Sequence, residues 1–268
     1  MLKKLIPALI LVAAVITPAH AVDIRSVIPY TVGNRWEYSV TEMDITSFGE
    51  GISSKSTESF AKGNSVTEVV SIKEQRSNDE AVYLERETEK LNPVLNTQPS
   101  TIVSESLVMT SPKGFFSTAE RSSDMDGNLR SKWQRYNPPL LAFNGDLTPG
   151  KAWEIGTAKE EGAVMPMKAQ VLGIETVTVP AGTFKDCIKV CAYTGTITGG
   201  FELEGKRAEI RNGREIHTVW IYPGVGVVKE MLLSQIQMAV DLGNAPGFVI
   251  MTGTQRKISE LKPGYIAK

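Results

Sequence analysis

Residues 217–231 read HTVWIYPGVGVVKEM, two β-branched and aromatic runs joined by the tetrapeptide PGVG. A loop that cradles a phosphate group needs glycine-rich backbone at the start of a helix. Val227 and Val228, which follow the glycines, begin no helix well. Pro223 fixes its own φ, and Gly224 supplies the positive φ that a type II turn requires. The stretch therefore predicts a tight corner between two strands.

The same pattern extends in both directions along the chain. In the stretch NRWEYSV, Trp36, Tyr38 and Val40 alternate with polar residues, which is the period of a half-buried strand. Turns rich in Gly, Asn, Asp and Pro separate such runs. Residues 227–240 (VVKEMLLSQIQMAV) also admit a helix, but their β-branched residues and the preceding glycine turn favour a strand.

A chain of sequential hairpins predicts an all-β protein with one large curved antiparallel sheet. A sheet of this size must twist and curl, so it forms a sandwich, closes into a barrel, or wraps as a half-barrel or open barrel around a filler. We expect the half-barrel or open barrel. Residues 22–268 would form this β domain.

Residues 81–91 (AVYLERETEKL) place Tyr83, Glu85, Glu87 and Glu89 on one face of a predicted strand. Charged side chains are rarely buried. We therefore expect this acidic face to contact solvent.

Residues 137–150 (NPPLLAFNGDLTPG) combine prolines and glycines with three large apolar residues, Leu140, Leu141 and Phe143. A loop of this composition either folds back onto the core or serves as a lid or partner-binding loop. It is the best candidate for the filler of the curved sheet. Leu140, Leu141 and Phe143 are accordingly the candidate ligand-binding residues.

The chain begins with Lys3 and Lys4, continues with an apolar run from Leu5 to Ile16, and then reads Ala-His-Ala at 19–21. These features are typical of a secretory signal peptide cleaved after Ala21. The apolar run is too short for a membrane anchor, which needs about 20 residues. Since no cysteine lies near the cut, we do not expect a lipid-modified N-terminus. No later stretch is long and apolar enough to predict a transmembrane segment. We expect a periplasmic or extracellular protein.

The charge balance, 29 basic against 30 acidic residues, gives no indication of nucleic acid or anionic lipid as a partner. Cys187 and Cys191 are four positions apart on a predicted strand, about 13 Å between Cα atoms at about 3.3 Å per residue. A disulfide spans less than about 7 Å. We expect small core-filling residues with no bridge between them.

The catalytic inventory is small. His20 leaves with the signal peptide, so His217 alone could serve a Ser-His-Asp triad or a histidine-based metal site. An isolated strand histidine is more often a surface or capped residue than a base. Asp124, Asp126 and Asn128 have the spacing of a calcium loop, but the sequence around them favours a hairpin turn. The sequence therefore predicts no metal, no cofactor and no enzymatic activity, although a carboxylate-based hydrolase stays open.

A resemblance to a class of known proteins rests on three stretches taken together: YTVGNRWEYSV (30–40), VTVPAGTFKDCIKV (177–190) and WIYPGVGVVKE (220–230). They resemble secreted or envelope-associated bacterial β-sheet proteins of unknown function that share GNxWxY, VPAGTFxxC and YPGVGxVK motifs. The resemblance implies a large curved antiparallel sheet, loosely similar to lipoprotein-carrier folds. It implies no activity and no catalytic residues.

Two functions remain open at this point. The concave face of a curved sheet can hold a lipid or another hydrophobic small molecule. Alternatively, a sheet edge or residues 91–100 (LNPVLNTQPS) contact another envelope protein, and no small ligand is involved.

Overall fold

The computed structural model describes residues 24–49, 55–96, 98–124, 126–160, 162–203, 206–241 and 248–268. The predicted signal peptide and its cleavage site lie outside these residues. Within them, no helix has the length and apolar character that crossing a membrane requires.

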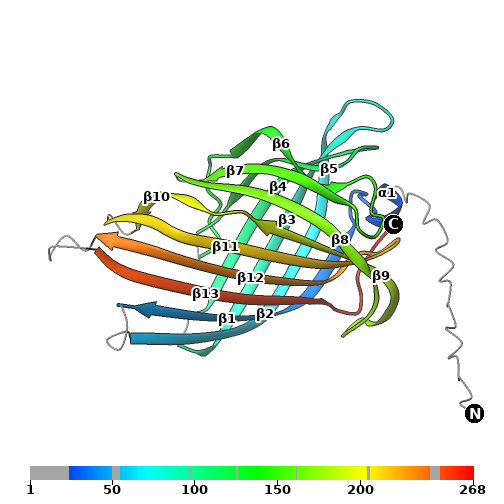
Figure 1. Cartoon of the computed structure of the whole chain (residues 1–268). Helices are drawn as coiled ribbons and strands as arrows, with labels where there is room; N and C mark the ends of the chain where they lie inside the picture. The colour runs from blue at the N-terminus through cyan, green and yellow to red at the C-terminus, as the bar shows by residue number, and fades with distance from the viewer. Residues whose placement is uncertain are drawn as a thin grey trace, which may run out of the picture.

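The described residues form one short helix and thirteen strands (Figure 1). The elements are α1 (Ile24–Val27), β1 (Arg35–Phe48), β2 (Lys55–Gln75), β3 (Ala81–Leu95), β4 (Ser100–Ser111), β5 (Gly114–Ser122), β6 (Gln134–Asn144), β7 (Ala152–Glu160), β8 (Ala163–Val179), β9 (Gly182–Thr194), β10 (Thr198–Leu203), β11 (Lys206–Tyr222), β12 (Gly226–Asp241) and β13 (Phe248–Leu261). Residues 227–240 are strand throughout, as their β-branched content predicts.

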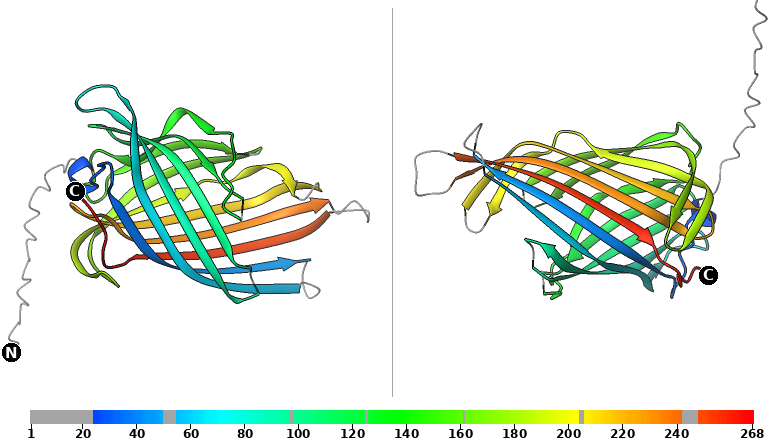
Figure 2. Two further views of the ribbon diagram at one scale, coloured as in Figure 1. Left: turned by 180° about the vertical axis from the view of Figure 1, so that it is seen from behind. Right: turned by 90° about the horizontal axis from the view of Figure 1, so that it is seen from below.

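The strands make one antiparallel sheet in the order β10-β8-β9-β11-β12-β13-β1-β2-β3-β4-β5-β6, with β7 paired to β8. Most neighbours are consecutive hairpins, which confirms the predicted all-β architecture. β1 instead lies between β2 and β13, pairing Tyr38 with Leu261. The first and last strands therefore pair in the middle of the strand order, and the sheet curves on either side of them (Figures 1 and 2).

The sheet does not close into a regular barrel. β6 and β7 lie at opposite ends of the strand order, and no ladder joins them in the part of the chain described. Side chains cross this seam instead: Trp153 Nε1 donates to the Leu141 carbonyl over 3.0 Å. Gln134 Nε2 donates to the Lys159 carbonyl over 2.7 Å. The seam is therefore held by side-chain hydrogen bonds where the rest of the sheet has a ladder.

The prediction of a loop over residues 137–150 is wrong for its first half. Residues up to Asn144 belong to β6, and only the residues from Gly145 to Lys151 connect it to β7. The ladder to β5 is interrupted between Leu140 and Arg135, so Pro138 and Pro139 occupy a stretch that makes no ladder pairs. Proline is tolerated on such an irregular edge strand because no ladder hydrogen bond is lost.

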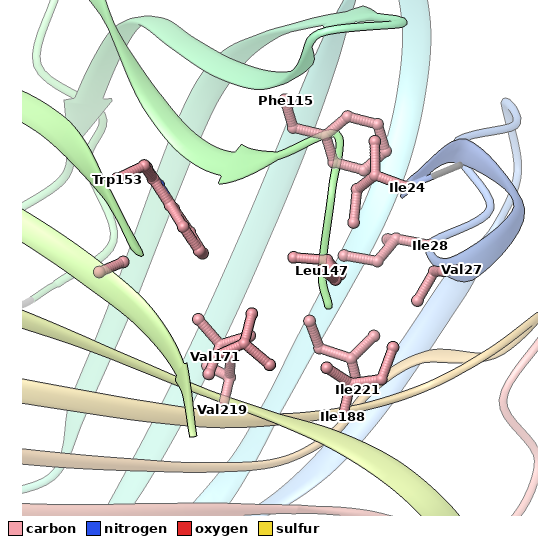
Figure 3. Packing of buried hydrophobic residues seen from close by; sticks show 12 residues of the cluster. Ile24, Val27, Ile28, Phe115, Leu147, Trp153, Val171, Ile188, Val219 and Ile221 are labelled. Carbon is pink, nitrogen blue, oxygen red and sulfur yellow. The ribbon is translucent and has the colours of Figure 1, made fainter. Parts of the chain in front are cut away.

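An apolar cluster fills the end of the curved sheet where α1 and the C-terminus lie (Figures 1 and 3). Ile24, Val27 and Ile28 come from α1 and the residue after it, and they are almost completely buried. They meet Phe115 of β5 and Leu147 of the β6–β7 connection. The filler is therefore mainly the α1 segment, together with Leu147 from residues 137–150, and Leu141 and Phe143 pack against it.

The PGVG stretch is a corner between β11 and β12, as predicted. Val225 N donates to the Tyr222 carbonyl over 3.0 Å, and Gly224 has φ +79°. Trp36 Nε1 donates to the Val225 carbonyl over 2.6 Å, which fixes the corner against β1. The cysteines are both on β9, as expected, and both thiols are free.

Candidate functional site

Two adjoining cavities lie inside the curve of the sheet, with volumes of about 310 Å³ and about 490 Å³. Five residues line both: Ser117, Ala142, Phe143, His217 and Val219. The walls of the smaller cavity come from β1–β6 on one side and β11–β13 on the other. We call the two cavities together the hollow.

The register of the ladders explains which side chains reach the hollow. Val219 of β11 pairs with Glu230 of β12, Glu230 pairs with Ser259 of β13, and Ser259 pairs with Val40 of β1. Directly paired residues of a sheet point to the same face. One transverse row therefore places an acid and a hydroxyl between apolar residues on the inner wall.

The acidic face of β3 points into the hollow, and the expectation that it contacts bulk solvent is wrong. Glu85 and Glu87 line the smaller cavity, and Glu89 is only 6% exposed. The opposite face of β3 carries Val82 and Leu84, which are also buried. Period-two alternation grouped these residues correctly but did not show which group faces inward.

Burial changes the acidity of these carboxyl groups. Desolvation raises the pKa of Glu85 to about 7, although the Tyr30 hydroxyl donates a hydrogen bond to it and opposes the rise. Desolvation also raises the pKa of Glu87, whose carboxylate accepts a hydrogen bond from Ser65 Oγ over 2.5 Å. The two groups that donate to Glu85 and Glu87 are thus neutral hydroxyls.

Two further acids of the inner wall are paired with cations. His217 Nε2 lies 2.8 Å from Glu230 Oε1, and Lys257 Nζ lies 2.5 Å from Glu89 Oε2. Burial alone would lower the pKa of His217, but the charge of Glu230 raises it overall. The side chains of His217 and Glu230 keep 39% and 35% of their surface accessible. Both line the smaller cavity, so this surface is available to a molecule inside it.

The sequence-predicted ligand residues are only partly brought together. Leu140 lines the larger cavity and Phe143 lines both. Leu141 packs instead against the apolar cluster around α1. Sequence reasoning did not place Glu85, Glu87 and Glu230 at a binding site. The available signal was the alternation of Glu85, Glu87 and Glu89 along β3, whereas Glu230 comes from β12.

The sequence predicts a surface or capped position for His217. The structure places His217 on the inner wall, where it lines both cavities. Among the described residues, His, Cys, Asp and Glu side chains form no cluster suited to a metal ion. Asp124 is the anchor of a turn: its Oδ1 accepts from the backbone N of Asp126 and of Asn128. This confirms the predicted hairpin turn.

No family model matches the chain, and no curated protein matches it. The solved structures that are similar to this chain include the following three. One is a candidate exported protein with a YmcC-like fold from Bacteroides fragilis, 14% identical, covering 88% of this chain and 97% of that one with a TM-score of 0.36. The second is a candidate lipoprotein from Parabacteroides distasonis, 16% identical, covering 88% and 96% with a TM-score of 0.37. The third is OccAB4 of Acinetobacter baumannii, 8% identical, covering 87% and 99% with a TM-score of 0.30.

Proposed function

We infer that this chain is an exported protein that binds a small amphipathic molecule inside the hollow, without catalysing a reaction. The observation that carries the proposal is the pair of adjoining cavities of about 310 and 490 Å³ with a shared wall. Small-molecule sites are concave, mostly apolar and roughly 300–1,000 Å³ in volume. Export is supported by the pattern of residues 1–21, which is typical of a signal peptide.

The apolar side chains of the larger cavity, which Glu120 and Glu215 also line, suit the apolar part of such a ligand. Its wall includes Leu140, Phe143 and Ile155, together with Met165 and Met167 of β8. Methionine side chains are flexible and polarisable, so they adapt to chains of different shape. Transfer of apolar surface from water into this cavity would contribute roughly 25 cal/mol for each Å² buried.

The smaller cavity suits the polar part. Glu85, Glu87, His217 and Glu230 supply hydrogen-bonding groups on a wall that is otherwise aromatic and aliphatic. A few polar groups on an apolar wall fix the orientation of a ligand.

The seam between β6 and β7 offers a route of entry. Leu140 of β6 and Ile155 of β7 both line the larger cavity, so the seam runs along its wall. Separating β6 from β7 breaks the hydrogen bonds of Trp153 and Gln134 but no ladder between these two strands. A ligand therefore meets less resistance here than between paired strands.

The test uses n-octanol, a neutral amphipathic probe, and isothermal titration calorimetry. Ala142 lines both cavities, so Ala142→Phe places a ring in the hollow. Ala152 is exposed at the start of β7 and provides the matched control, Ala152→Phe. We expect octanol to bind the unchanged protein and the control, and to lose measurable binding to Ala142→Phe. Absence of binding to the unchanged protein, or full binding to Ala142→Phe, would contradict the proposal.

A further inference from the structure

Five aromatic side chains surround the smaller cavity. They are Tyr30, Trp36, Tyr38, Phe115 and Phe143. We call this part of the hollow the aromatic chamber.

Hydrogen bonds and ring contacts hold these rings in place. Trp36 Nε1 donates to the Val225 carbonyl over 2.6 Å, and the Tyr38 hydroxyl donates to the Val227 carbonyl over 3.0 Å. Tyr30 packs edge-on against Phe115, with ring centroids 5.1 Å apart. The chamber therefore keeps its width without a ligand, because its wall residues are fixed by contacts with one another and with the PGVG corner.

Two of the three acids that line the chamber, Glu85 and Glu87, have no ion-pair partner among the described residues. They accept hydrogen bonds from the hydroxyls of Tyr30 and Ser65. His217 is paired with Glu230. The charge of Lys257 lowers the pKa of Glu87, but Lys257 makes its ion pair with Glu89. Two carboxyl groups thus face an aromatic cavity with only neutral donors.

We propose that the aromatic chamber binds the cationic head of an amphipathic organic amine, with primary or quaternary nitrogen. This inference rests on the proposed function and names the class of ligand for the same site. Aromatic faces attract a cation through their quadrupole, most strongly where water is excluded. Glu85 and Glu87 add direct charge complementarity, and the larger cavity holds the apolar chain.

The same charges disfavour the other head groups. An anionic head would meet Glu85, Glu87 and Glu230, and like charges in a poorly solvated site repel strongly. A neutral head would leave the two carboxyl groups without a counter-charge. In the absence of ligand, the pKa of Glu85 at about 7 is consistent with a proton taking the place of that counter-charge.

Three probes with the same apolar chain test the inference: octyltrimethylammonium, n-octanol and octyl sulfate, each titrated calorimetrically into the full exported chain. We expect octyltrimethylammonium to bind at least about tenfold more tightly than octanol. Octyl sulfate should bind more weakly than octanol. Titrations in two buffers with different ionisation enthalpies should show proton release on binding of octyltrimethylammonium alone.

Two nearly isosteric variants locate the effect. Glu85→Gln and Glu87→Gln remove one carboxyl group each, and we expect each to weaken octyltrimethylammonium binding by about tenfold, more than it weakens octanol binding. Glu68→Gln is the control, because Glu68 is exposed on β2, next to β3. Octanol or octyl sulfate binding as tightly as octyltrimethylammonium would overturn the cation preference but leave the proposed function standing. If no probe binds, both proposals fail. The ranking of the three probes on the unchanged protein does not depend on how well either variant folds.

Discussion

His217 and Glu230 form an ion pair diagonally across β11 and β12. The ladder pairs His217 with Leu232 and Glu230 with Val219, yet His217 Nε2 lies 2.8 Å from Glu230 Oε1. Burial alone would lower the pKa of His217 and raise that of Glu230, but their mutual attraction reverses both shifts. The inner wall of the hollow therefore carries a charged pair over a definite range of pH.

This pair predicts a pH-dependent loss of stability for Glu230→Gln. The pKa of Glu230 is lowered from its ordinary value of 4.5, so this group contributes stability at pH values above 4.5. The pKa of His217 is raised from its ordinary value of 6.5, so this group contributes stability at pH values below 6.5. The contribution is lost as the pH rises through the folded-state pKa of His217. Because both groups are about one-third accessible, we expect a loss of about 1 kcal/mol at pH 5.5, or about 2–4 °C in Tm.

Thermal unfolding of the unchanged protein and Glu230→Gln at pH 5.5 and 8.5 measures this effect. His217 carries less of its charge at pH 8.5 than at pH 5.5, so the two melting temperatures should lie closer together at the higher pH. Glu215 and Lys257 also act on the charge of His217, and both remain in the variant. An equal difference in Tm at both pH values would show that the pair is structural rather than ionic.

The affinity of octyltrimethylammonium should rise with pH. Deprotonation of Glu85, with a pKa of about 7, supplies the charge that attracts the probe. We expect the association constant to increase several-fold between pH 6 and pH 8, since a cation binds the carboxylate form preferentially. Calorimetric titrations across this range measure the slope.

Other titratable groups face the same chamber and must be separated from Glu85. They are Tyr30, Tyr38, Glu87, His217, Glu230 and, through the ion pair with Glu89, Lys257. Loss of the proton from His217 also makes the wall more negative as the pH rises. Glu85→Gln should therefore reduce the slope without abolishing it, and an unchanged slope would exclude Glu85 as the titrating group.

Glu105 is the centre of an ionic clamp on the outer face of the sheet. Its carboxylate is 2% exposed and accepts two hydrogen bonds from Arg86 at Oε1 and two from Arg121 at Oε2, with the shorter bond of each pair at 2.6 Å. The Arg121 guanidinium also stacks on Trp133 at 4.7 Å. The clamp links β3, β4 and β5 across three strands.

Glu105→Gln should destabilise the protein by about 2 kcal/mol, because one acceptor is lost and two guanidinium groups are left facing a neutral amide. Urea unfolding at pH 7 measures the change, with exposed Glu58→Gln as the control. Burial opposes but does not overcome the two arginines, which lower the pKa of Glu105. The difference between the two proteins should therefore shrink as the pH falls below 4.5. A stability equal to that of the control would contradict the clamp.

The sheet could be predicted from the sequence because its determinants are local. Alternation in Trp36, Tyr38 and Val40 and the glycine turns act over a few residues, and hairpins connect most neighbouring strands. Pairing of β1 with β13 depends on residues more than two hundred positions apart, and no local pattern encodes it. The same limit explains the error at Pro138 and Pro139, where a local breaker signal lies on an irregular edge strand.

The hollow was harder to predict than the sheet. Alternation grouped Glu85, Glu87 and Glu89 on one face, but the curvature of the whole sheet decides which face is concave. The general rarity of buried acids then favoured the wrong face. Phe143 and Leu140 were identified because large apolar residues beside prolines are conspicuous, whereas the role of His217 depends on its diagonal neighbour Glu230.

A comparison of Gly224, in the PGVG corner, with Gly253 of β13 tests whether the corner needs a left-handed residue. Gly224 has φ +79°, and a Cβ added there would meet no heavy atom within 4 Å, so Gly224→Ala introduces backbone strain but no clash. Gly253 of β13 has equal space without a positive φ. We expect Gly224→Ala to cost about 1–2 kcal/mol, whereas Gly253→Ala should be neutral or slightly stabilising. Urea unfolding of the two variants measures the contrast. Equal stability would mean that the corner does not need its left-handed residue, and that the turn assigned to residues 222–226 is wrong.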